Sequence, residues 1–209
     1  MANSKKAHWE AVYRAKAASA VSWYEAQPAQ SLREIRASGV KFAEPIIDVG
    51  GGASLLVDEL LRAGYRDVTV LDISGDVVAQ LSTRLARFGS AVHVIRSNVL
   101  AFIPKRTYAL WHDRAMFHFL VKKQDRMHYR DTLGHALALT GQVVMATFGP
   151  EGPEKCSGLP VVRYDAESLS AELGPAFRLL SSSLVTHRTP VGAEQQFLYC
   201  RFERGAANP

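Results

Sequence analysis

The sequence predicts an α/β fold, in which seven strands alternate with helices and an antiparallel pair of strands closes the sheet. Three observations predict it. From residue 45 onward, short apolar runs of strand length alternate with segments of helix length. A cluster of glycines follows the first of these runs directly, as is typical where a parallel strand turns into a helix. The last two strand-like runs are long and closely connected, which favours antiparallel pairing.

The expected elements follow one another with short connections. We expect residues 1–44 to form an N-terminal helical lid, with helices at about 8–16 and 28–38, and residues 45–209 to form one core domain. Strands are expected at 45–49, 67–72, 91–95, 108–112, 142–147, 177–187 and 195–202. Helices of the core are expected at about 54–63, 75–88, 123–139 and 166–173.

The composition is that of a globular enzyme. The chain has 209 residues, of which 47% are hydrophobic and 22% charged, and this excludes a disordered or collagen-like chain. No apolar run approaches the roughly 18–20 residues of a membrane-spanning helix. The N-terminus lacks the apolar region of a secretion signal, so we expect a cytoplasmic protein. Two cysteines, Cys156 and Cys200, cannot make a disulfide framework.

The most informative segment joins the first strand to its helix. Gly50, Gly51 and Gly52 allow a tight turn and a close approach of the backbone to a ligand. The helix start that follows presents free N–H groups. Asp72 ends the next strand, about 20 residues further on, which is the separation of a carboxylate that binds a ribose diol. Together these features predict a nucleoside site.

The residues around the glycines narrow the choice of nucleoside. A dinucleotide site has a third glycine where this chain has Leu55, and no Gly-Lys-Ser/Thr follows as in a P-loop. Asp48 stands just before the glycines, where a carboxylate would repel a pyrophosphate but could hold an ammonium group. A ligand with a ribose, an ammonium group and no phosphate is S-adenosylmethionine.

Two motifs resemble those of a known family. The segments 48–54 (DVGGGAS) and 70–74 (VLDIS) are similar to the first two motifs of class I, Rossmann-like, seven-stranded S-adenosylmethionine-dependent methyltransferases. The resemblance extends over nearly the whole chain in element order. It implies a doubly wound, mostly parallel sheet with helices on both faces and a C-terminal antiparallel pair.

The resemblance also implies the cofactor contacts. The glycines would pass under the methionine part, Asp72 would bind the ribose hydroxyls and Ile73 would pack on the adenine. Asn98 and Val99, after the third strand, would lie at the adenine edge. The family usually has an acid in the place of Asn98, but an amide also accepts a hydrogen bond from the adenine amino group.

The segment after the fourth strand supplies the candidate catalytic residues. We expect Asp113 to contact the methionine ammonium or the acceptor, and His118 to act as a proton acceptor. Arg114 could pair with a carboxylate of the acceptor. Packing of the aromatic-rich segment 117–119 in the core is the alternative. The Asn/Asp-Pro-Pro-aromatic motif of nucleobase amino-methylating enzymes is not at this place, which disfavours that class.

Aromatic residues of the N-terminal segment resemble a lid. Trp9, Tyr13 and Trp23 are similar to the lid aromatics of the thiopurine, thiol and halide methyltransferase branch, and of small protein-lysine methyltransferases. They would cover the cofactor, and aromatic faces attract a sulfonium cation. The alternative is an amphipathic helix that packs on the sheet.

We therefore expect a metal-independent methyltransferase whose acceptor is a small molecule, such as a thiol. A protein-lysine N-methyltransferase is the alternative, with a basic helix (Lys122, Lys123, Arg126, Arg130) as its docking face. A non-catalytic nucleoside-binding module or a dehydrogenase is the third. The net charge of +5 leaves a nucleic-acid partner open, but no basic arm or aromatic-interleaved patch supports one. His-x-x-x-His and Cys-x-x-Cys metal motifs are missing from the sequence.

Overall fold

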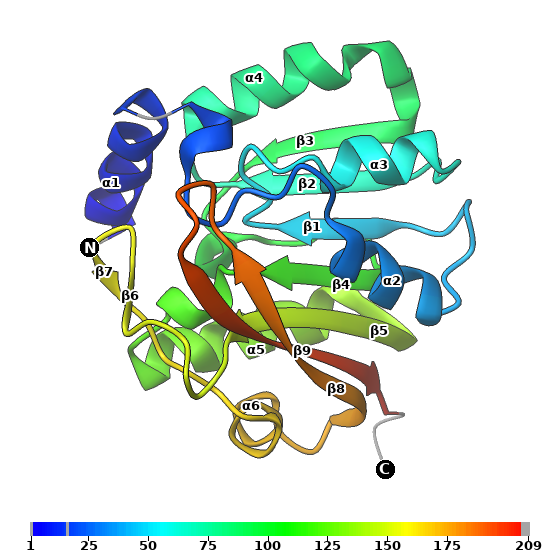
Figure 1. Cartoon of the computed structure of the whole chain (residues 1–209). Coiled ribbons are helices and arrows are strands. Elements are labelled where there is room, and N and C mark those ends of the chain that lie inside the picture. Colours follow the sequence, from blue (N-terminus) through cyan, green and yellow to red (C-terminus); the bar gives the residue numbers. More distant parts are fainter. Residues whose placement is uncertain (1, 16, 206–209) are drawn as a thin grey trace.

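The computed structural model describes residues 2–15 and 17–205, and Figure 1 shows their arrangement. The α-helices are α1 (Ala2–Ala15), α2 (Ala29–Ala37), α3 (Leu56–Arg62), α4 (Gly75–Leu85), α5 (Lys123–Ala136) and α6 (Ala166–Leu173). The strands are β1 (Ile46–Val49), β2 (Val68–Asp72), β3 (Val92–Arg96), β4 (Tyr108–Arg114), β5 (Leu137–Phe148), β6 (Lys155–Cys156), β7 (Leu159–Pro160), β8 (Phe177–Arg188) and β9 (Glu194–Arg204). Short 3-10 helices are η1 (Ala18–Ala20), η2 (Ala86–Ala91), η3 (Val99–Ala101) and η4 (Phe117–Phe119).

The main sheet has seven strands in the order β3-β2-β1-β4-β5-β9-β8. Strands β1 to β5 pair in parallel, while β9 is antiparallel to both β5 and β8. Residues of β1 and β2 are buried throughout, as expected of central parallel strands that helices cover on both faces. The structure thus confirms the predicted Rossmann-like, seven-stranded fold class.

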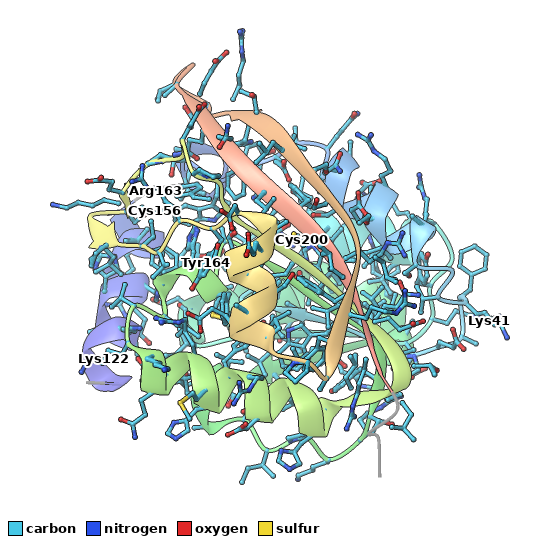
Figure 2. The ribbon with its side chains drawn as sticks, turned by 90° about the horizontal axis from the view of Figure 1, so that it is seen from below. Lys41, Lys122, Cys156, Arg163, Tyr164 and Cys200 are labelled. Atoms are coloured by element: carbon cyan, nitrogen blue, oxygen red, sulfur yellow. The ribbon has the colours of Figure 1, made fainter. Side chains whose placement is uncertain are left out.

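Alternation along the strands divides the core between the two faces of the sheet. Ile46, Val70 and Leu110 pack with α2, α3 and α4 on one face. Ile47 and Trp111, one residue along, pack with α5 and α6 on the other. Figure 2 shows α5 and α6 side by side over this second face. The helix α2, which we expected to be part of the lid, takes a place in the helical layer through the fully buried Ile35.

The carboxyl ends of the parallel strands share one edge of the sheet, on the left in Figure 1. Helix α1, the small β6–β7 hairpin and the turn between β8 and β9 gather at this edge. In open α/β sheets, ligands bind at this edge, where neighbouring loops diverge.

Several elements differ from the prediction, and helix α1 begins at Ala2 instead of at about residue 8. Strand β4 continues to Arg114, so Asp113 and Arg114 belong to the strand itself. Helix α5 ends at Ala136, and β5 begins at the next residue because Leu137 pairs with Tyr108. The loop 149–160 contains the β6–β7 hairpin, which two-residue strands do not reveal by periodicity. No helix of the described part of the chain is long and apolar enough to cross a membrane.

Candidate functional site

A cavity of about 450 Å³ lies at the carboxyl edge of the sheet, beneath α1. Its floor includes Gly50 and Asp72, from the ends of β1 and β2. The other lining residues whose roles were predicted are Trp9, Tyr13, Trp23, Ile73, Asn98 and Val99. The structure therefore brings most of the predicted cofactor residues together around one space. Arg114, Met116 and Phe119 line its far wall.

Gly50, Gly51 and Gly52 form the glycine loop, whose backbone conformation and lack of side chains allow a ligand to approach it closely. Gly50 and Gly52 have φ of 66° and 54°, in the left-handed region that favours glycine. A Cβ on Gly52 would stand 2.4 Å from the hydroxyl of Tyr13, and one on Gly50 would stand 2.7 Å from Met116. The loop is thus shaped by contacts with α1 and with the turn after β4.

Arg84 of α4 holds the backbone that follows the glycines. Its guanidinium donates to the carbonyl oxygens of Ser54, at 2.6 Å, and Ala53, at 3.3 Å. It also forms an ion pair of 2.9 Å with Asp58, a buried carboxylate of α3. This pairing fixes the path of the chain from the loop into α3.

Asp72 is a buried carboxylate at the edge of the cavity. Its Oδ2 accepts from the backbone N–H of Gly52 at 3.0 Å, and its Oδ1 accepts from Ser74 at 2.8 Å. Burial raises the pKa of Asp72 to about 6, against the opposing effect of these backbone hydrogen bonds. The two bonds tie the end of β2 to the glycine loop and leave lone pairs for a ligand hydroxyl.

Asn98 lies at the opposite end of the cavity floor. Its Oδ1 accepts from the N–H of Leu100 at 3.1 Å and so caps η3. Ile73, Asn98 and Val99 surround this end with apolar surface and one amide. Such a surrounding suits a flat heterocycle with a polar edge.

Aromatic side chains close the cavity on the side of α1. The rings of Trp9 and Trp23 meet edge to face with centroids 5.7 Å apart, and Trp9 meets Phe119 in the same manner at 5.0 Å. Tyr13 lies 6.3 Å from Trp23, and burial raises the pKa of its hydroxyl well above the usual range. The hydroxyl of Tyr13 therefore stays protonated at neutral pH.

Polar contacts attach α1 to the core at both of its ends. Lys5 Nζ donates to the carbonyl oxygen of Phe119 at 3.1 Å. Near the other end, Arg14 pairs with Asp76, the second residue of α4, at 2.7 Å. Residues of this helix line the cavity, and these contacts hold it there.

Arg114 points from the end of β4 toward the N-terminal segment. Its Nε donates to the Tyr199 hydroxyl at 3.0 Å, and its NH1 donates to the Trp23 carbonyl at 2.8 Å. Its NH2 lies 3.1 Å from a carboxylate oxygen of Glu25. The guanidinium therefore holds the segment 23–25 against the sheet, so the predicted pairing with an acceptor carboxylate would require these contacts to break.

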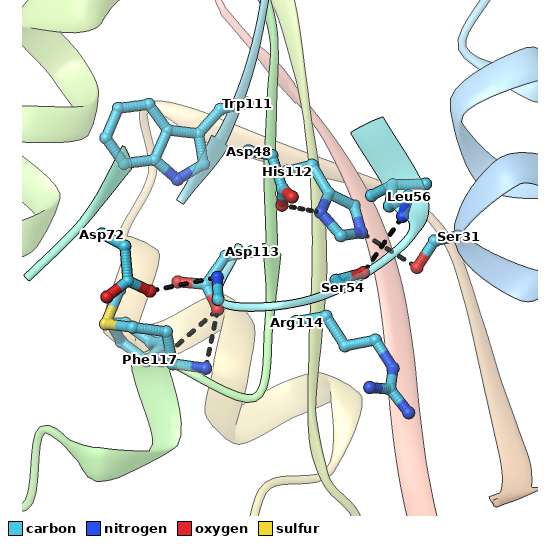
Figure 3. Close-up of polar contacts among 12 residues, drawn as sticks. Ser31, Asp48, Ser54, Leu56, Asp72, Trp111, His112, Asp113, Arg114 and Phe117 are labelled. Carbon is cyan, nitrogen blue, oxygen red and sulfur yellow. Dashed lines mark hydrogen bonds and ion pairs between the residues drawn. The ribbon is translucent and has the colours of Figure 1, made fainter. Parts of the chain in front are cut away.

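A buried chain of three polar side chains lies on the α2 face of the sheet. Nδ1 of His112 is 2.7 Å from Oδ1 of Asp48, and its Nε2 is 2.9 Å from Oγ of Ser31. Figure 3 shows the three side chains in a row, with dashed lines along both contacts. Asp48 and His112 are neighbours because they pair in register on β1 and β4, and Ser31 comes from α2.

The structure does not support the predicted catalytic role of Asp113, nor its role in cofactor binding. Asp113 is fully buried under α5 and accepts hydrogen bonds from the Tyr129 hydroxyl at 2.7 Å and from the N–H groups of Met116 and Phe117 at 3.1 Å. Burial raises its pKa to about 6. Since β4 continues through it, Asp113 faces the same side as Trp111 and holds the turn that places Met116 at the cavity.

His118 is also in the core and does not line the cavity, so the predicted role as proton acceptor is not supported. Its Nδ1 accepts from the N–H of Phe148 at 3.3 Å, and its ring packs between Phe119 and Phe148. Burial lowers the pKa of His118 to about 3, which makes it a poor base at neutral pH. These contacts agree with the alternative interpretation, in which the segment 117–119 packs in the core.

Two residues that sequence reasoning did not assign are His112 and Ser31. His112 has the same parity as Asp48 on the adjacent parallel strand, so the strand alignment could have placed the two side by side. The contact with Ser31 depends on how α2 packs, which no local pattern encodes. The place of Met116 at the cavity was not predicted either. It depends on the turn around Ala115, whose positive φ of 63° has no signature in the sequence.

Two other residues named in the sequence, Cys156 and Arg126 of the basic helix, have structural surroundings of their own. Burial raises the pKa of the Cys156 thiol to about 11, so it is protonated at neutral pH. In the basic helix, Arg126 forms an ion pair of 2.9 Å with Glu172 of α6. Among the described residues, no group of three or more His, Cys, Asp or Glu side chains could hold a metal ion.

Comparisons with solved structures identify the fold. A protein from work on the conversion of a disulfide bond into a thioacetal group during echinomycin biosynthesis superposes with a TM-score of 0.76 at 15% identity, over 97% of this chain and 93% of that chain. An S-adenosylmethionine-dependent methyltransferase from Anabaena variabilis gives a TM-score of 0.73 at 14% identity, over 97% and 94%.

A third similar structure contains ligands. It is the 1,6-didemethyltoxoflavin-N1-methyltransferase of Burkholderia thailandensis with bound 1,6-didemethyltoxoflavin and S-adenosylhomocysteine, with a TM-score of 0.71 at 16% identity, over 98% of this chain and 85% of that chain. No protein-family model and no curated protein matches the sequence. At these identities the likeness establishes the class I methyltransferase fold, and the activity has to be argued from the site.

Proposed function

We propose that this protein is an S-adenosylmethionine-dependent methyltransferase that acts on a small-molecule nucleophile. The observation that carries the proposal is the buried Asp72 carboxylate, hydrogen-bonded to the glycine loop on the floor of a cavity of about 450 Å³. A carboxylate in this place accepts hydrogen bonds from a ribose diol. The presence of S-adenosylhomocysteine in the similar Burkholderia structure supports the same assignment.

The residues around the cavity fit the three parts of this cofactor. Ile73, Asn98 and Val99 would hold the adenine, and Asp72 the ribose. The methionine part would run over Gly50, Gly51 and Gly52 toward Asp48, where a smaller cavity lined by Asp48, Gly50 and Gly51 begins. A pyrophosphate would meet the Asp48 carboxylate instead, so the dehydrogenase alternative fits less well.

When bound, the cofactor supplies a methyl group on a sulfonium for in-line displacement. The chain's own residues align the reactants and exclude water, which is the main task for such a transfer and requires no metal ion. Trp9, Tyr13 and Trp23 would cover the sulfonium with aromatic surface. Asp113 and His118 have no catalytic role in this proposal. A general base is not essential, because a soft nucleophile such as a thiolate needs little help from one.

A small acceptor is favoured by the way α1 closes the site. Lys5 and Arg14 attach α1 over the cavity, so an acceptor on a folded protein would reach the site only while this helix is open. The similar Burkholderia protein has a small heterocycle bound. The protein-lysine alternative relies on the basic helix, and there Arg126 is already paired with Glu172. The prediction of a cytoplasmic protein remains part of this proposal, and so does the division into lid (1–44) and core (45–209), except that α2 packs in the helical layer of the core.

The decisive experiment offers labelled S-adenosylmethionine to the purified protein with a cell lysate. We expect label in small or volatile products, and we expect Asp72→Asn to abolish it. Label in a protein band would support the lysine alternative instead. Binding of NADH in preference to S-adenosylhomocysteine would contradict the whole assignment.

A further inference from the structure

The chain Asp48–His112–Ser31 has no part in the fold's hydrophobic core and none in the methyl-transfer step, yet its side chains are buried. Asp48 is 3% exposed, His112 2% and Ser31 0%. Burying three polar side chains costs free energy unless each is hydrogen-bonded, and here each is. Hydrophobic residues would fill this space at lower cost, so the arrangement calls for another reason.

The two oxygens of Asp48 have different surroundings. Oδ1 is held by His112 Nδ1, while Oδ2 lies against Gly51, 2.6 Å from where a Cβ on that residue would stand. The small cavity lined by Asp48, Gly50 and Gly51 is also lined by His112 and Ser31. One oxygen is thus anchored, and the other is turned toward the glycine loop.

His112 can anchor the carboxylate in only one arrangement of the neutral ring. A carboxylate oxygen accepts, so Nδ1 must donate to Asp48. Nε2 then carries the lone pair, and the Ser31 hydroxyl donates to it. The Asp48 carboxylate, which can only accept, therefore selects the tautomer, and the Ser31 hydroxyl, which can donate or accept, satisfies Nε2 and holds the ring in this orientation.

We propose that His112 is a positioning residue that directs Asp48 toward the ammonium group of the methionine part of S-adenosylmethionine, and that Ser31 holds the His112 ring in the orientation required for this. The inference rests on the proposed function. It adds that an N-terminal helix, α2, contributes through Ser31 to recognition of the amino-acid end of the ligand. The prediction is specific to that end, because neither residue lines the cavity that would hold the adenosine.

The test compares two ligands that differ only at this end. S-adenosylhomocysteine carries the ammonium group, whereas 5′-methylthioadenosine has the same thioether and adenosine without the amino-acid part. Titration calorimetry of the full chain should show that His112→Leu weakens binding of S-adenosylhomocysteine by about tenfold or more, the effect of losing a hydrogen bond to a charged group. Binding of 5′-methylthioadenosine should stay within about twofold of the wild type.

Matched variants separate positioning from folding. His112→Asn places an amide N–H near Nδ1 and should restore most of the affinity for S-adenosylhomocysteine. Ser31→Ala removes the distal partner of His112, together with a hydrogen bond between Ser31 and Tyr199, and should give a smaller loss with the same ligand selectivity. Asp72→Asn is the control for the shared ribose and should weaken both ligands alike. If His112→Leu does not fold, the His112→Asn and Ser31→Ala variants still test the inference.

The outcomes distinguish the inference from the proposed function. Equal weakening of both ligands in the His112 and Ser31 variants, or weakening of neither, would overturn the inference while the cofactor assignment stands. Failure of the wild-type protein to bind either ligand would overturn the proposed function itself.

Discussion

At the scale of single residues, Asp72 gives the site a dependence on pH. Its pKa is raised to about 6 by burial, so the carboxylate becomes protonated within an accessible range. A protonated Asp72 is a poorer acceptor for ribose hydroxyls. We predict that the affinity for S-adenosylhomocysteine falls as the pH is lowered through about 6. In Asp72→Asn the affinity should be lower at neutral pH and should lack this dependence, and fluorescence titration at several pH values measures both.

Asp113 is a second single residue whose role can be tested, and this role is to stabilise the fold. Replacing it by alanine leaves the Tyr129 hydroxyl and the N–H groups of Met116 and Phe117 without their acceptor in the core. Such losses cost about 1–3 kcal/mol per buried group, offset in part because a buried charge is removed. We predict that Asp113→Ala lowers the free energy of unfolding by about 2–4 kcal/mol in urea denaturation.

Tyr129→Phe is the matched change for Asp113. The change removes the hydroxyl that donates to Asp113. It also removes the acceptor of the Trp111 indole N–H, whose nitrogen lies 2.8 Å from the Tyr129 oxygen. We expect a loss of about 1–3 kcal/mol, and methyl transfer at a temperature where the variant is folded should be close to that of the wild type. A large fall in turnover with unchanged stability in the phenylalanine variant would contradict the structural role assigned to this pair.

At the scale of elements, the glycine loop and α1 are fitted to each other. Gly52 and Gly89 both have positive φ, of 54° and 56°, but only Gly52 would bring a Cβ against another residue, the Tyr13 hydroxyl. We predict that Gly52→Ala weakens binding of S-adenosylhomocysteine at least tenfold. Gly89→Ala also places an alanine at a positive φ and should destabilise the fold, but it should leave binding unchanged. Equal effects of the two changes on binding would contradict the fitted contact.

Helix α1 is an element whose closure the ligand should stabilise. Its described attachments are the aromatic contacts of Trp9 and Tyr13, the Lys5 hydrogen bond, and the ion pairs of Arg14 with Asp76 and of Glu10 with Arg96. Exposed ion pairs contribute only about 0–1 kcal/mol, so the helix should open readily in the free protein. We predict that saturating S-adenosylhomocysteine slows tryptic cleavage within residues 2–15 severalfold. Unchanged cleavage rates would mean that α1 is not a lid.

The elements themselves could mostly be predicted from sequence, whereas the contacts between distant elements could not. Apolar runs located every strand of the main sheet, and the spacing of Gly52 and Asp72 located the floor of the cavity. The end of β4 was placed two residues early, and this error made Asp113 seem to lie in a loop at the edge. Packing of Tyr13 on Gly52 and of Ser31 on His112 joins residues far apart in sequence, and no local periodicity encodes such contacts.

At the scale of the whole molecule, the chain has the architecture of a methyltransferase core with a short N-terminal cover. Its net charge is +5. Several of its basic side chains, including Arg84, Arg114 and Arg126, are engaged within the fold. The basic excess is thus spread over internal contacts and helix faces.

In the proposed function, the cavity beneath α1 binds S-adenosylmethionine through Asp72. Calorimetric titration of the purified chain at pH 7.5 with S-adenosylhomocysteine tests it most directly, with NADH as the competing ligand. We predict one binding site per chain, an affinity at least tenfold lower in Asp72→Asn, and no binding of NADH. Absence of binding by the wild-type protein, or an affinity that Asp72→Asn leaves unchanged, would contradict the account.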